Sequence, residues 1–148
     1  MKRFFRSILG VTLLEIMLVL AIAAMVIVMS IRYYQSATAS QQANTVMQQV
    51  QGIIAAADNF AQPTGTYSGI TSANIGPLLP AQGLSLPWGA SIALSGAGAN
   101  TYTMTLTSTP PAVCRLISGK LASNRSLTIT GACGTAAANV VVKYTANP

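Results

Sequence analysis

The chain has 148 residues, of which 51% are hydrophobic and only 7% are charged, and its formal net charge is +6. This composition excludes a charge-rich disordered protein, and the length accommodates one modest domain together with a membrane anchor. Three of the eight cations lie within the first six residues, so the basicity partly belongs to the N-terminus.

The chain begins with a short basic leader, residues 1–10, followed by an apolar stretch over residues 11–31. The polar residues of this stretch are Thr12, Glu15 and Ser30. A helix of about 20 apolar residues crosses the roughly 30 Å hydrocarbon core of a bilayer. Cations that precede such a segment keep the N-terminus in the cytoplasm. The pattern therefore predicts a single membrane span, with the rest of the chain on the far side of the membrane.

Glu15 is the one carboxylate inside this apolar stretch. A charged residue at the centre of a membrane helix costs roughly 2.5–3.5 kcal/mol, and less near an end of the helix. Such residues usually have a partner and a function. The alternative is that Glu15 lies close enough to the cytoplasmic interface for lipid headgroups to solvate it.

The helix is expected to continue beyond the membrane, because no glycine or proline occurs between Val11 and Gln51. After Arg32, apolar residues recur at steps of three and four, which is typical of an amphipathic helix. We expect one helix from about Val11 to Phe60, with lipid around its first half and a globular domain packed on its second. Turn residues end it: Pro63, Gly65 and Gly69.

The remaining sequence is rich in glycine, serine, threonine, alanine and proline, and it predicts an antiparallel sheet. Its clearest strand covers residues 101–108, where threonine alternates with other residues at period two. The other expected elements are strands at 91–95, 126–130 and 140–144 and a short helix at 112–122. A long helix followed by a sheet gives an α+β fold. The expected domains are a leader at 1–10, a transmembrane half-helix at 11–38 and a globular domain at 39–148.

The two cysteines are Cys114 and Cys133. An even number of cysteines in an exported domain favours a disulfide. Two unrelated buried thiols are the alternative.

The N-terminal sequence Gly10-Val11-Thr12-Leu13-Leu14-Glu15 resembles the cleavage site of type IV pilins and the related pseudopilins. This resemblance implies that a prepilin peptidase cuts after Gly10 and that Val11 becomes the N-methylated first residue of the mature chain. It also implies that Glu15, then at position five, pairs with the free α-amino group of a neighbouring subunit during assembly.

The rest of the chain resembles the type IVb branch, which includes bundle-forming-type pilins, in Pro87-Trp88-Gly89 and in Cys133 ahead of a last strand that ends at Tyr144. The leader is short for that branch, and Arg32 stands where many type IVa pilins have proline. The resemblance implies a pilin-like fold, a helical homo-oligomeric filament and no cofactor. It also implies an inner-membrane precursor, and an assembly platform and ATPase as partners.

Other interpretations remain open. The N-terminal segment could be a permanent anchor, or a signal peptide cut after Ala39, although the apolar stretch exceeds the typical h-region of about 7–15 residues. Within the pilin architecture, the alternatives are a minor pilin and a type II secretion pseudopilin. A membrane-anchored adhesin or DNA-uptake module is the alternative from another class.

Few other residues indicate a site. Arg32, Tyr33 and Tyr34 suit the outer membrane interface or packing against the domain. For Trp88 and Tyr102, core packing is favoured over ligand binding. The cations of the C-terminal part are scattered, which favours a solvated surface over nucleic-acid binding. The chain has no histidine and no recognisable catalytic or metal-binding constellation, so we do not expect an enzyme.

Overall fold

A computed structural model of the chain describes residues 12–80 and 83–146. Gly10 and Val11, the residues of the predicted cleavage site, lie outside the described residues. The chain divides into two compact units, Met1–Ala37 and Thr38–Pro148. Their elements are, in chain order, α1 (Leu13–Ala61), α2 (Ser72–Ile75), a 3-10 turn η1 (Gly76–Leu78), β1 (Ile92–Gly96), β2 (Thr101–Thr109), α3 (Pro111–Leu121), β3 (Leu127–Thr130) and β4 (Ala138–Thr145).

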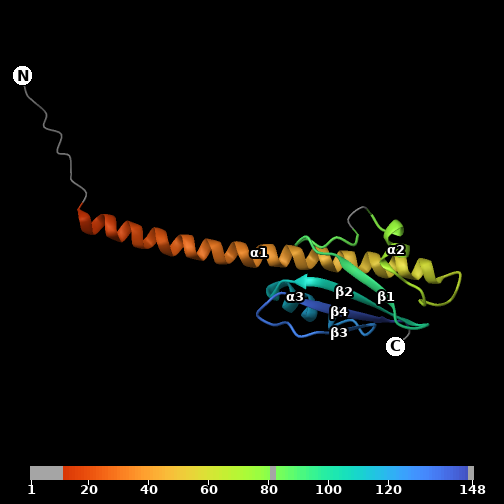
Figure 1. The fold of residues 1–148 in the computed structure, drawn as a ribbon. Helices are drawn as coiled ribbons and strands as arrows, with labels where there is room; N and C mark the ends of the chain where they lie inside the picture. Colours follow the sequence, from red (N-terminus) through yellow and green to blue (C-terminus); the bar gives the residue numbers. More distant parts are fainter. Residues whose placement is uncertain (1–11, 81–82, 147–148) are drawn as a thin grey trace, which may run out of the picture. The chain divides into compact units, whose positions relative to one another are not determined.

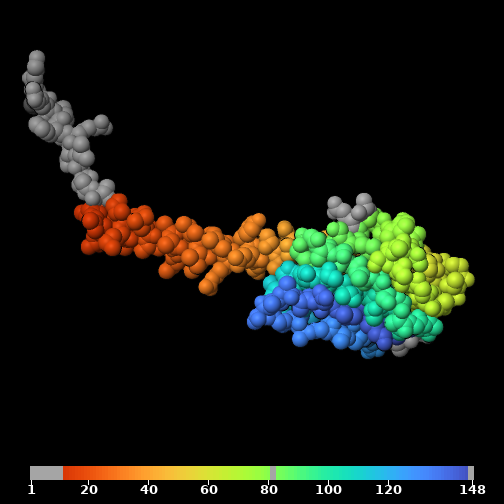
Figure 2. All heavy atoms as spheres, viewed as in Figure 1, coloured from red at the N-terminus to blue at the C-terminus, as the bar shows by residue number. Residues whose placement is uncertain are grey.

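The first unit contains the beginning of α1 (Figure 1). Every residue from 12 to 37 is exposed in the single chain (Figure 2). The helix begins at Leu13 and ends at Ala61, close to the predicted bounds. It is continuous because it contains no proline, so that no backbone donor is missing from the hydrogen-bond ladder.

The second half of α1 belongs to the globular unit, where one helix face is buried. Its buried residues follow steps of three and four along one face: Ala39, Ala43, Val46, Val50, Ile53, Ala56, Ala57 and Ala61. The sheet lies along this part of the helix (Figure 1). The predicted amphipathic stripe is thus the face that packs on the sheet.

The sheet is antiparallel throughout and has the strand order β1-β2-β4-β3. One row of facing residues runs Leu94, Met104, Val142 and Ile129. Buried apolar residues alternate with half-buried threonines on β2 and with exposed serine and lysine on β1 and β4, so that one face of the sheet is apolar. The apolar face joins the buried face of α1 in one continuous core. The fold is therefore the predicted α+β arrangement of a long helix on a small antiparallel sheet.

The strand bounds differ from the predicted ones by one or two residues. The pairing of β2 with β4 is interrupted by a register shift between Leu106 and Thr109. Ser108 occupies it with a φ of 51°, and its N–H donates to Asn139 Oδ1 at 3.0 Å. Pro111 then stands in the first turn of α3, where its missing N–H costs nothing.

The connection between α1 and β1 contains two short elements, α2 and η1, that the sequence pattern did not predict. After α1, the backbone first adopts a left-handed conformation at Gly65, whose φ is 67°. The Gly65 N–H donates to Ala61 O at 2.7 Å. Thr71 caps α2, because its side chain accepts the N–H of Asn74. This connection also covers the outer edge of β1, where Gly96 N–H donates to Ile70 O at 2.9 Å.

Candidate assembly surface

An exposed apolar surface covers the first half of α1. Large hydrophobic side chains stand in solvent over residues 13–31, and Leu13 and Met29 are 78% and 64% exposed. This helix is long and apolar enough to cross a membrane. An apolar surface of this extent marks a membrane-interaction or protein-interaction site.

Glu15 lies in the first turn of α1 and is exposed. Thr12 precedes the helix and accepts the N–H of Glu15 both at its carbonyl oxygen, at 3.0 Å, and at Oγ1, at 3.3 Å. A threonine cap with glutamate three residues later is the capping-box spacing. The carboxylate also lies near the positive end of the helix dipole. Sequence reasoning missed this cap by Thr12, although the Thr-x-x-Glu spacing was the signal for it.

Arg32, Tyr33 and Tyr34 directly follow the apolar stretch, and all three are exposed. Tyr33 and Tyr34 are 79% and 70% exposed.

Cys114 and Cys133 form the expected disulfide, with their Cα atoms 5.7 Å apart. Cys114 is buried on α3, and Cys133 is half-buried in the connection between β3 and β4. The bond ties this connection to a helix that packs on the core. It thereby fixes one end of the sheet.

Trp88 and Tyr102 serve packing rather than an open site. Tyr102 is fully buried, and the half-buried Trp88 donates from Nε1 to Thr107 O at 3.0 Å. The ring centroid of Tyr102 lies 5.3 Å from that of Tyr67 and 5.0 Å from that of Tyr144, and those two are 6.0 Å apart. These three rings form a tyrosine cluster.

Asp58 is the only carboxylate among the described residues of the globular unit, and it accepts the hydroxyl of Tyr67 at 2.7 Å. Burial, followed by this hydrogen bond, raises the pKa of Tyr67 above its ordinary value of 10.0. Burial and the charge of Asp58 likewise raise the pKa values of Tyr102 and Tyr144. The Tyr102 hydroxyl has no hydrogen-bond partner among the residues that the structure describes.

The cations of the globular unit are all exposed. Arg115 and Lys120 lie on α3, Arg125 lies in the turn before β3, and Lys143 lies on β4. Lys120 donates to the amide oxygen of Asn44 on α1.

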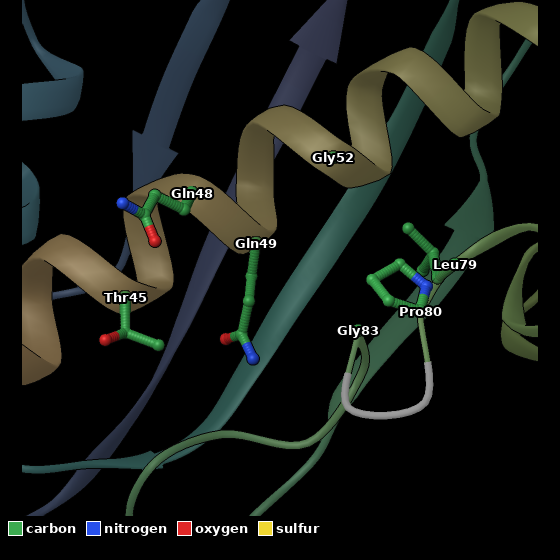
Figure 3. A pocket seen from close by; sticks show the side chains of 7 residues that line it. All are labelled: Thr45, Gln48, Gln49, Gly52, Leu79, Pro80 and Gly83. Carbon is green, nitrogen blue, oxygen red and sulfur yellow. The ribbon is translucent and has the colours of Figure 1, made fainter.

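A groove that sequence reasoning did not predict lies beside the second half of α1 (Figure 3). Its volume is about 250 Å³. Its helix side consists of Thr45, Gln48, Gln49 and Gly52, and its other side consists of Leu79, Pro80 and Gly83. Gln49 Nε2 donates to Ser85 O at 2.7 Å, which joins the two sides. No periodic pattern links these two segments, so the sequence offered no signal for the groove.

Among residues 12–80 and 83–146, no three histidine, cysteine, aspartate or glutamate side chains are grouped so as to hold a metal ion. Comparison of the chain with protein-family models, with curated proteins and with solved structures finds no match.

Proposed function

We propose that this protein is the structural subunit of a type IV pilus-like filament. In this proposal the chain is made as an inner-membrane precursor, is cleaved after Gly10, and polymerises through the first half of α1. The role is structural rather than catalytic. The observation that carries the proposal is one continuous helix that exposes an apolar surface over residues 13–31, bears a carboxylate in its first turn and supports a folded domain on its second half.

The physical basis is that the same apolar helix surface serves two environments. In the precursor this surface contacts lipid tails, and in the filament it contacts the equivalent helices of other copies. Little hydrophobic free energy separates the two states, because lipid tails are about as apolar as leucine. Packing between helices and specific polar contacts must then favour the filament.

Glu15 supplies such a polar contact in the proposal. Cleavage after Gly10 creates a free α-amino group on Val11, which is mostly cationic at neutral pH. Pairing this group with Glu15 of a neighbouring copy compensates two charges that are costly to keep apart in an apolar surrounding. The pair forms only between copies, so its benefit arises on assembly.

The test compares Glu15→Ala and Glu15→Gln with the unchanged protein, and electron microscopy of sheared surface material measures filament yield. Glutamine keeps the side-chain length and the capping-box pattern but removes the charge. We expect both variants to insert and be cleaved normally and to lose most of their filaments. Normal yield from Glu15→Gln would contradict the pairing role.

The same preparations separate a major subunit from the alternatives. The proposal predicts that this chain is the main component of the filaments by mass spectrometry. Filaments dominated by another protein would instead indicate a minor pilin or a pseudopilin. If no growth condition yields filaments, the proposal itself is contradicted.

A further inference from the structure

Gly52 lies inside α1, nine residues before the helix ends, and the contacts of the single chain do not require a glycine there. Glycine inside a helix is unfavourable compared with alanine, because its backbone loses more conformational freedom on folding. A Cβ atom added at Gly52 would meet Leu79 Cδ2 at 3.8 Å, which is ordinary van der Waals contact. Its φ is not in the left-handed region. The fold of one copy therefore accommodates alanine at this position.

Gly52 forms part of the groove between α1 and the segment that follows η1 (Figure 3). The groove of about 250 Å³ is below the roughly 300–1,000 Å³ of small-molecule sites. An apolar cavity of about 150 Å³ holds benzene, so the groove has room for one large side chain. Leu79 and Pro80 make its second wall apolar. Its size and walls fit a hydrophobic side chain rather than a cofactor.

The helix face beside the groove carries no charge. Residues 33–57 include no aspartate, glutamate, lysine or arginine. The exposed positions there are small or carry amides and hydroxyls, as in Gln41, Gln48 and Ala55. Another helix can approach such a face without stripping water from a charge of α1 itself, a step that costs several kcal/mol per buried ion. The charge that borders this face is the ammonium of Lys120, which donates to Asn44.

The chain itself supplies the matching apolar side chains. Among the described residues of the globular unit, the exposed large hydrophobic ones are Leu78 and Leu116. The others lie on α1 between Leu13 and Tyr34. We propose that the groove at Gly52 receives an apolar side chain from the first half of α1 of a second copy of this chain. This inference rests on the proposed filament, and it extends the contact surface along the same helix into the globular unit.

Substitutions at Gly52 test the inference, with Gly119 as the matched control. Gly119 is an exposed glycine in α3, and a Cβ there meets nothing within 4 Å. We expect Gly52→Ala and Gly119→Ala both to raise the melting temperature of the full chain in detergent by roughly 2–6 °C. Gly52→Leu fills the groove and should lower filament yield about ten-fold or more, whereas Gly119→Leu should leave the yield unchanged.

The melting temperatures separate a blocked contact from a damaged fold. Filaments of Gly52→Leu at the yield of the unchanged protein would overturn the inference and leave the filament proposal intact. Failure of the unchanged protein to form filaments would overturn both. Loss of filaments together with a melting temperature well below that of the unchanged protein would mean that Gly52 serves the fold, and would also overturn the inference.

A photo-crosslinking residue in place of Gln48 gives an independent test in assembled filaments. We expect adducts with residues 13–34 of a second copy, identified by mass spectrometry. The control places the same residue at Thr130, which is exposed on β3, and should give no such adduct. Adducts from position 48 that join it only to its own chain would contradict the inference.

Discussion

At the scale of single residues, Gly96 is a glycine because neighbouring backbone lies too close to leave room for a side chain. Gly96 ends β1 beside the connection that covers this strand. A Cβ atom at Gly96 would lie 2.7 Å from Tyr67 O and 3.0 Å from Gly69 N, both of them backbone atoms. The same connection accepts the Gly96 N–H at Ile70 O. An added methyl group would have to push this backbone away from the strand.

We therefore expect Gly96→Ala to lower the free energy of unfolding by about 1–3 kcal/mol, the usual range for overpacking. Urea denaturation of a soluble fragment, residues 38–148, measures the change. Gly119→Ala is the control and should not destabilise this fragment. Equal stabilities of Gly96→Ala and the unchanged fragment would contradict the close contact.

The tyrosine cluster makes a prediction about alkaline pH. Its three tyrosines keep their protons in the folded state above the ordinary pKa of 10.0, whereas in the unfolded chain they lose them near pH 10. The folded state then binds more protons, so the free energy of unfolding must fall as the pH rises above about 10. Below that pH the cluster's contribution is fully present. Urea titrations between pH 8 and pH 11 measure this decline.

Tyr102→Phe is the sharpest variant of the cluster. It removes a buried hydroxyl that has no hydrogen-bond partner among the described residues, and it keeps the ring that contacts Tyr67 and Tyr144. We expect it to raise the free energy of unfolding at pH 7 by about 1 kcal/mol, because an unpaired buried hydroxyl is costly. The decline above pH 10 should also become shallower. A clear loss of stability at pH 7 would show that the hydroxyl is paired after all.

At the scale of elements, the disulfide compensates for a small core. It closes a loop over a sequence separation of 19 residues and joins α3 to the connection between β3 and β4. The β3 strand has only four residues and lies at the edge of the sheet. Chain-entropy arguments assign roughly 3 kcal/mol to a loop of this size.

We expect Cys114→Ser in the fragment of residues 38–148 to lower its melting temperature and to expose it to protease. The expected loss is about 2–4 kcal/mol, a large part of the stability of a small domain. Thermal unfolding monitored by circular dichroism measures it. Treating the unchanged fragment with a reductant should reproduce the loss. An unaltered melting temperature in both cases would mean that packing alone holds the β3 end of the sheet.

The elements also show what the sequence could predict. Helix α1 and strand β2 were predictable because each has a long, regular pattern, of 3.6 residues for the helix and of two for the strand. The short α2 and η1 were not, since seven residues rich in turn formers have no period to detect. The disulfide followed from an even cysteine count in an exported domain, and the structure agrees.

Some features of the candidate assembly surface could likewise be predicted from the sequence, and others could not. The exposed apolar face over residues 13–31 could be predicted from hydropathy alone, and the structure leaves that face uncovered. The groove at Gly52 could not be predicted, because it forms where α1 meets a segment 27 or more residues further along the chain. The local cap on Glu15 by Thr12 was available in the sequence as a capping-box spacing and was missed.

At the scale of the whole molecule, the proposed subunit combines a membrane-embedded first half of α1 with a globular domain on the far side of the membrane. The globular unit has its own core, which includes the second half of α1, the inner face of the sheet and α3. It can therefore keep its structure while the surroundings of the first half of α1 change from lipid to protein. This division of one helix between two tasks is the central feature of the proposed filament subunit.

The most direct test of this account is the N-terminal sequence of the protein recovered from sheared surface filaments. The account predicts a mature chain that begins at Val11 and reads VTLLE, with a mass that allows for one added methyl group on Val11. A chain that still begins at Met1 would indicate a permanent anchor. A chain that begins at Ser40 would indicate an ordinary signal peptide, and either result would contradict the proposed filament subunit.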